Sequence, residues 1–233
     1  MPTHPEAHSA KSNAKLNSLR AAVLGADDGI VSVSGIVIGV ASASASSALI
    51  LTSGIAGLAA GALSMAAGEY VSVSSQRDTE RALLTKERAE LKNYPEQELK
   101  ELENLYIAKG LKPVTARAVA KELTTKDVFA AHVDAELNIN PDDLTNPWHA
   151  AIASALSFLV GAMIPLLTIV LAPEKIRILV TFVAVIFALI ITGMLSAHVG
   201  GANKTRATIR VVAGGVLAMA VTYGIGKIVG TQL

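Results

Sequence analysis

Apolar residues gather into five long segments, and a highly charged stretch separates the second segment from the third. The apolar segments run over residues 19–43, 48–73, 148–171, 176–199 and 209–229. As helices, all five are long enough to cross about 30 Å of hydrocarbon at about 1.5 Å per residue. The pattern predicts an all-α, polytopic membrane protein with five transmembrane helices. The alternative for the first two segments, which are rich in Ser, Gly and Ala, is a buried hairpin of a soluble protein.

The charged stretch indicates a helical insert between the two apolar blocks. We therefore expect four parts: a cytoplasmic tail over 1–18, transmembrane helices 1–2 over 19–75, a cytoplasmic helical metal-binding domain over 76–147, and transmembrane helices 3–5 over 148–233.

Proline and glycine mark the expected helix boundaries inside the insert. Pro95 should end the helix that continues from the second span. Gly110 should stop a helix over 96–109, and Pro113 suits the first turn of another. The sequence TTKD at 124–127 is similar to a capping box and predicts a further helix over 124–138.

Basic residues set the expected orientation, because cytoplasmic loops carry the excess of Lys and Arg. With the N-terminus in the cytoplasm, 17 of the 20 basic residues lie on the cytoplasmic side, and five spans put the C-terminus on the opposite side. Residues 41–47, ASASASS, then form a short uncharged outer turn. This turn and a polar N-terminus unlike a cleaved signal peptide fit a bacterial plasma (inner) membrane.

Composition narrows the range of functions. The chain is 52% hydrophobic, with a mean hydropathy of +0.48, which is unusual for a soluble domain. Residues 76–147 hold 11 basic and 14 acidic groups, so the insert carries a net negative charge. A nucleic-acid partner needs a basic surface, so this charge argues against one. The chain has no cysteine, which excludes disulfides and thiolate metal sites.

Two aspartates, Asp27 and Asp28, lie near the start of the first span. Asp28 should lie about two turns inside a helix that begins near Arg20, which favours an ion pathway, although aspartate can also cap a helix N-terminus. For Asp27 we expect capping or an interface position. In the second span Met65 and Glu69 share a helix face, and a carboxylate with a thioether favours late first-row divalent ions. Met65 as packing filler is the alternative.

Small residues four apart occur in both of these spans. Gly35 and Gly39 form one such pair, and Gly57 and Gly61 form another. This spacing allows helices to approach closely, so the first two spans are expected to pack on each other or to pair across a dimer axis.

The insert carries acidic pairs at helical spacing. Glu87 and Glu90 are three apart, as are Glu98 and Glu101, and a turn at Pro95 could bring the two pairs together. His132 and Glu136, four apart, could complete the cluster, since like charges held together need a cation to neutralise them. The alternative is a solvated charged face, because Lys86, Arg88, Lys92 and Lys100 lie nearby.

At this point the chain resembles the vacuolar iron transporter family. The segments LRAAVLGADDGIVSVSGIVIGV and GALSMAAGEYVSVSSQ carry the resemblance, with the carboxylate-rich insert that follows them. The resemblance covers the chain from about Leu16 to its end. It implies five transmembrane helices, a homodimer, and export of Fe²⁺ and often Mn²⁺ from the cytosol in exchange for protons.

The resemblance also implies roles for individual residues. It implies that the membrane site includes Asp28 and Met65, and that the cytoplasmic metal ligands are Glu87, Glu90, Glu98, Glu101 and Glu136. Two positions depart from the family pattern: Asn17 stands where a glutamate is frequent, and His132 stands where a methionine is frequent. Imidazole is itself a good ligand for Fe²⁺, Mn²⁺ or Zn²⁺.

The expected function is a proton-coupled transporter that exports Fe²⁺, Mn²⁺ or both, with Asp28, Met65 and Glu69 along its pathway. We expect no enzymatic activity and no bound cofactor other than the transported ion. The alternatives are a membrane-anchored, ferritin-like ferroxidase and a metal-storage protein. The sequence has Glu-x-x-Glu twice and lacks the Glu-x-x-His of di-iron bundles, which counts against the ferroxidase.

Overall fold

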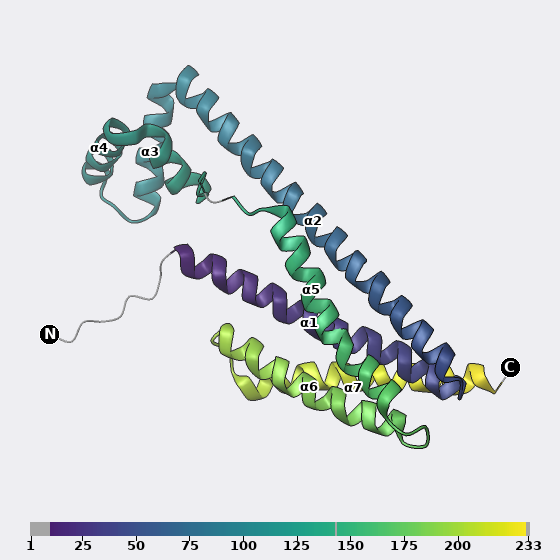
Figure 1. Cartoon of the computed structure of the whole chain (residues 1–233). Coiled ribbons are helices and arrows are strands. Elements are labelled where there is room, and N and C mark those ends of the chain that lie inside the picture. The colour runs from purple at the N-terminus through teal and green to yellow at the C-terminus, as the bar shows by residue number, and fades with distance from the viewer. Residues whose placement is uncertain (1–9, 143, 232–233) are drawn as a thin grey trace. The chain divides into compact units, whose positions relative to one another are not determined.

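A computed structural model describes residues 10–142 and 144–231, with side chains from residue 22 onward, and all regular structure in this part is helical (Figure 1). The helices are α1 (Ala10–Ala43), α2 (Ser47–Asn93), α3 (Pro95–Ala108), α4 (Pro113–His132), the π-helical segment η1 (Val133–Leu137), α5 (Pro147–Leu171), α6 (Arg177–Val199) and α7 (Lys204–Gly230). They divide into two compact units: a membrane unit up to Tyr70 and from Trp148 onward, and an insert unit over Val71–Pro147.

Five helices are long and apolar enough to cross a membrane: α1 from Ala22, α2, α5, α6 and α7. Their length and composition confirm the prediction of an all-α, polytopic membrane protein with five spans. Helix α2 continues well past its apolar part, to Asn93, as the absence of Gly and Pro over 76–92 led us to expect.

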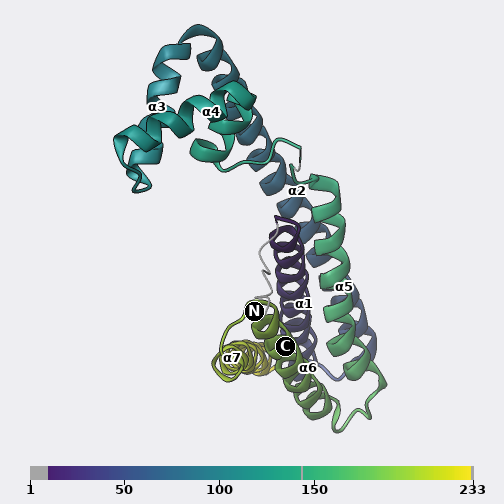
Figure 2. The ribbon, with the colours of Figure 1, turned by 90° about the vertical axis from the view of Figure 1, so that its left-hand side faces the viewer.

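The membrane unit has two apolar cores that share α1. The first core joins α1, the beginning of α2, and α5, and it centres on Val33, Val37 and Phe158. The second core joins α1, α6 and α7 through Ile38, Leu189 and Met219. Figure 2 shows α1 between these two groups of helices, so α1 contacts neighbours on opposite sides.

Close backbone approaches differ from those expected of the glycine pairs. A Cβ on Gly29 would lie 2.9 Å from the backbone nitrogen of Ala162 in α5, so glycine permits this contact. Gly35 and Gly39 face Thr222 of α7 and do not face α2. Of the two alternatives predicted for the glycine pairs, packing of the first two spans on each other is wrong for the pair in α1, because α7 occupies that face. In α2, Gly57 meets Ile36 of α1, whereas Gly61 meets Phe158 of α5.

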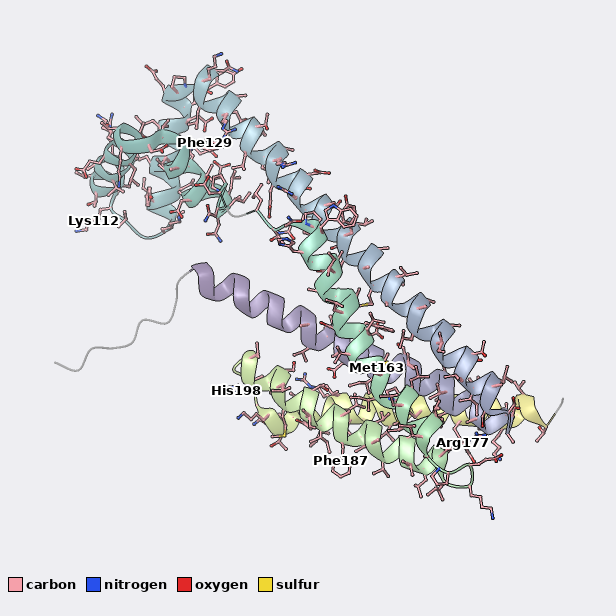
Figure 3. All side chains as sticks on the ribbon, in the orientation of Figure 1. Lys112, Phe129, Met163, Arg177, Phe187 and His198 are labelled. Carbon is pink, nitrogen blue, oxygen red and sulfur yellow. The ribbon has the colours of Figure 1, made fainter. Side chains whose placement is uncertain are left out.

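Arg177 ties the turn between α1 and α2 to the start of α6 (Figure 3). Its Nη2 donates to the carbonyl oxygen of Ala45 at 2.9 Å, and its Nη1 donates to Oγ of Ser47 at 3.1 Å. Arg177 is only 5% exposed, so these acceptors replace water around its charge. The turns before α2 and before α6 therefore lie together, as expected if both face the same side of the membrane.

The boundaries of α3 and the start of α4 follow the predicted turn chemistry. Gly110 has φ of +99°, and its N–H donates to Ile107 while the N–H of Leu111 donates to Tyr106. These two bonds form a Schellman motif. Pro113 occupies the first turn of α4.

The expected capping box at 124–127 is wrong in detail. Helix α4 continues through Thr124 and bends at Asp127, whose φ and ψ are −163° and 98°. Oδ1 of Asp127 accepts the N–H of Ala130 at 2.9 Å, so Asp127 itself caps the segment after the bend. The bend is followed by η1, which ends at Asn138 in the left-handed conformation.

Candidate metal centre

Three helices of the insert unit each contribute one buried ligand-type side chain to a single point. Glu87 comes from α2, Glu98 from α3, and His132 from the end of α4, and one ligand atom of each lies within 4.8 Å of the others. Nδ1 of His132 lies 3.2 Å from Oε1 of Glu87 and 3.8 Å from Oε2 of Glu98. The three residues are 3%, 7% and 0% exposed in the order Glu87, Glu98, His132.

The polar atoms of this group lack ordinary partners. Oε1 of Glu87 and both ring nitrogens of His132 are buried and have no hydrogen-bond partner among the described residues. Although Nδ1 and Oε1 are 3.2 Å apart, the pair is not aligned as a hydrogen bond. Buried polar atoms are rarely left unpaired, so atoms that converge without bonding each other are typical of an ion site.

A small apolar core joins α3 to α4. Leu102 of α3 packs against Ala120 and Ala131 of α4, and Leu99 and Tyr106 cover this contact. Alanine on α4 lets α3 approach closely, so Glu98 and His132 are presented toward each other. Packing between α3 and α4 therefore positions these two ligands.

The π-helical turn η1 places a fourth candidate at the edge of the group. Oε2 of Glu136 lies 4.0 Å from Nδ1 of His132, and its side chain is 28% exposed. A π turn widens the spacing of side chains, and such turns are frequent at functional sites. Glu136 is therefore close enough to reach an ion held by the buried three, with access to solvent.

The other two predicted glutamates lie outside the buried group. Glu90 forms an ion pair with Lys86 at 3.1 Å, and Glu101 is exposed on α3. Their charges nevertheless act on the buried carboxyls, and Glu101 is the largest neighbouring charge acting on Glu98 and Glu136. Glu90 and Glu101 therefore make the electrostatic potential around the buried group more negative, although their side chains do not belong to that group.

Burial and mutual repulsion hold protons on the group. Burial raises the pKa of Glu87 to about 7, and the charges of nearby glutamates, Glu136 foremost, add to this shift. Burial also raises the pKa of Glu98 and of Glu136, and it lowers the pKa of His132. At neutral pH the imidazole is neutral with a lone pair, and a cation that binds the carboxylates displaces protons.

The donor set suits a particular class of ion. Imidazole with carboxylate oxygens is a ligand set for Fe²⁺, Mn²⁺ and Zn²⁺, whereas Mg²⁺ and Ca²⁺ prefer oxygen alone. Three buried groups with a fourth at the edge leave room for a bound ion to exchange. The residues present therefore fit a divalent transition metal as cargo.

Asp28 and the pair Met65 and Glu69 lie on two different helices of the membrane unit, α1 and α2. Asp28 is exposed and its Oδ1 accepts a hydrogen bond from Oγ of Ser32 at 2.7 Å. Met65 is half-buried against the first apolar core, and Glu69 is half-buried one turn further along α2. No hydrogen bond or ion pair among the described side chains joins Asp28 to either of them.

Asp27 has a partner that sequence reasoning missed. It accepts a hydrogen bond from the hydroxyl of Thr192 on α6. Helix α1 begins at Ala10, so Asp27 does not cap it. Its hydrogen bond with Thr192, 165 positions away in sequence, instead joins α1 to α6. Asn17 lies in the part of α1 whose side chains the structure does not describe.

Comparison with known proteins shows the family of the chain. The VIT family profile matches residues 19–227. Similar proteins include a "Vacuolar iron transporter" of Acanthamoeba castellanii, 46% identical over 89% of this chain and 77% of that protein. A "Vacuolar iron transporter homolog 2.1" of Arabidopsis thaliana is 36% identical over 91% of this chain and 82% of that protein. A "Vacuolar iron transporter homolog 1" of Oryza sativa subsp. japonica is 37% identical over 93% and 76% respectively. With most of its length matched in this way, the chain belongs to the VIT family.

Proposed function

We propose that this protein is a proton-coupled transporter that exports Fe²⁺, Mn²⁺ or both from the cytosol. The observation that carries the proposal is the buried group of Glu87, Glu98 and His132 in a protein with five membrane-spanning helices. Relatives that are named as iron transporters or their homologues support iron as the transported ion. In this proposal the insert unit collects the ion on the cytosolic side.

Asp28, Met65 and Glu69 are proposed to carry the ion through the membrane unit. A carboxylate in a span is costly unless it faces a partner, a cavity or an ion. Asp28 is exposed in the single chain, as is Ser32 one turn further along α1. A second copy that covers this face supplies the protein environment that Asp28 needs, which supports a homodimer with the pathway near its interface.

Exchange of metal for protons follows from competition for the same lone pairs. At the insert site, the raised pKa of Glu87 means that protons and a divalent ion compete near neutral pH. In the membrane, protonation of Asp28 from the far side would release its ion. Loss of that proton to the cytosol would then return Asp28 to the ionised form that binds the next ion. The direction, the proton coupling and the use of Mn²⁺ are parts of this proposal.

Reconstitution distinguishes this function from its rivals. Purified protein in liposomes should move Fe²⁺ or Mn²⁺ into the lumen, as reported by a trapped metal-sensitive dye. A storage protein would bind the ions without flux. A ferroxidase would consume oxygen when Fe²⁺ is added in detergent, and the expectation that the chain is not an enzyme predicts no such consumption.

The membrane that houses the protein also stays a proposal. The relatives are eukaryotic, and the names of these proteins refer to the vacuole, so they give no support to a bacterial inner membrane. We propose that the insert unit faces the cytosol wherever the protein resides, because it holds 11 of the 20 basic residues. Fluorescent tagging in the source cell identifies the membrane.

A further inference from the structure

A polar cavity of the insert unit is lined by several cations, whereas the metal group is acidic. It has a volume of about 450 Å³ and lies between α2 and the segment that precedes α5. Helix α2 contributes Arg77, Arg81 and Arg88 to its wall, and Pro141, Asp142 and Leu144 face them. A volume of this size is within the range of about 300–1,000 Å³ that is typical of small-molecule sites.

The three arginines form one stripe on α2. At about 100° per residue, positions 77, 81 and 88 lie within about 40° of each other around the helix. Arg77 and Arg81 are one turn apart, so their guanidinium groups can reach the same ligand. Arg88 lies further along the cavity, where its guanidinium stacks over the ring of Phe129 at 4.5 Å from the centroid.

Among the described residues, the cavity wall holds more positive than negative charge. Of the described wall residues Asp142 alone is acidic, and no ion pair joins a described carboxylate to Arg77 or Arg81. In addition, Nε of Arg77 is buried and has no hydrogen-bond acceptor within the described part of the chain. A buried guanidinium donor is costly to leave unpaired, so an acceptor oxygen is missing from this wall.

We propose that this cavity binds a phosphate-bearing anion through Arg77 and Arg81, with Arg88 as a further positive wall. The planar guanidinium presents paired N–H donors that match phosphate oxygens, which makes arginine suited to this ligand. This site is separate from the metal group, whose ligand from α2, Glu87, is buried against His132.

Two sources can supply the same phosphate chemistry. Arg77 follows the end of the second apolar segment by four residues, a position at which basic side chains meet anionic lipid headgroups. A phosphorylated lipid headgroup is one source, and a soluble phosphate ester of the cytosol is the other. Both would bind the same arginines, so the experiment must separate the lipid from the free headgroup.

The test uses the full-length protein in detergent with two kinds of probe. Native mass spectrometry measures retention of phosphatidylinositol 4-phosphate against phosphatidylcholine, and calorimetry measures binding of inorganic phosphate and inositol trisphosphate. The variant is Arg77→Gln with Arg81→Gln. The control is Arg117→Gln with Lys121→Gln, which removes the same charge from α4, outside the cavity.

The variant Arg77→Gln with Arg81→Gln should bind at least about tenfold more weakly to whichever phosphate probe the wild type binds. The reason is that it loses charge-assisted hydrogen bonds to the phosphate. The control should bind as the wild type does, and all variants should bind Mn²⁺ equally, which shows that the insert unit is folded. Retention of the lipid alone assigns a headgroup, and binding of the soluble esters assigns a cytosolic ligand. Equal losses in the cavity and control variants, or no preference of the wild type for any phosphate probe, would overturn the proposal.

Discussion

Nδ1 of His132 lies 3.2 Å from Oε1 of Glu87, yet neither atom has a hydrogen-bond partner among the described residues. The two residues come from helices that are 45 positions apart in sequence. Buried polar atoms without partners are costly, and a group that binds the imidazole and the carboxylate together removes that cost. A divalent ion can accept both lone pairs, which is why we propose that the fold of the insert unit serves metal transport.

Glu98→Gln should weaken binding of Mn²⁺ to the purified full-length protein by at least about tenfold. Removing a residue that only supports a metal ligand typically costs about 10–100-fold in metal affinity, and removing a ligand should cost no less. The amide keeps the size of Glu98 and removes its charge. The matched control is Glu103→Gln on the same helix, where the carboxylate pairs with Lys100 instead. Calorimetry should show the control close to wild type. Equal losses in both variants would mean that Glu98 acts only through general charge.

The metal-free protein should lose stability as pH rises. The folded pKa of Glu87 is about 7 and its ordinary value is 4.5, so between these values the folded state holds a proton that the unfolded state has released. Stability therefore falls between pH 4.5 and 7, by no more than roughly 3.5 kcal/mol at about 1.4 kcal/mol per pKa unit. Added Mn²⁺ should reverse the fall.

Glu87→Gln supplies the control for this pH dependence, because the amide does not titrate. Apparent Tm of the full-length protein, measured from pH 5 to pH 8, should decline in the wild type and decline less in the variant. If the two proteins show the same slope, Glu87 is not the group responsible.

The orientation can be tested directly, because the chain has no cysteine that would react in the background. Ala45→Cys and Lys175→Cys should react with a membrane-impermeant maleimide from the same side, since Arg177 joins the two turns. Ala202→Cys and Lys126→Cys should react only from the other side. Labelling of Ala45→Cys and Lys126→Cys from one side would contradict the proposed topology.

Asp28→Asn should abolish metal flux, because the amide keeps the size of Asp28 and removes its charge and its titratable proton. Asp27→Asn should retain substantial flux, since asparagine can still accept the hydrogen bond from Thr192. Metal binding by the insert unit should be unchanged in both variants. Flux of Asp28→Asn near the wild-type rate in proteoliposomes would rule out the assigned pathway.

Local rules made much of the fold predictable. Hydropathy located the five spans, and the chemistry of Gly110 and Pro113 located the end of α3 and the start of α4. The bend at Asp127 and the π turn of η1 were not predictable, because no residue there forbids a regular helix. Near them, Ala131 and Ala135 pack with Leu102 of α3, a tertiary contact that local sequence rules do not display.

The candidate site was predictable as a set of residues but not as an arrangement. Spacing treated Glu87 and Glu90 alike, whereas the structure buries Glu87 and pairs Glu90 with Lys86 at the surface. The contact between Asp27 and Thr192 had no signal in the sequence, since 165 positions separate them. Pairing across helices depends on the tertiary fold, which a single sequence does not display.

Metal flux into sealed proteoliposomes tests the central claim most directly. Wild-type protein is reconstituted with one dye for Mn²⁺ or Fe²⁺ and one dye for pH trapped in the lumen, which is acidic relative to the outside. The account predicts that the metal enters while lumenal protons leave, and that collapsing the pH gradient with a protonophore slows the entry. Binding of the metal without any flux, or flux at the same rate with and without the pH gradient, would contradict a proton-coupled metal exporter.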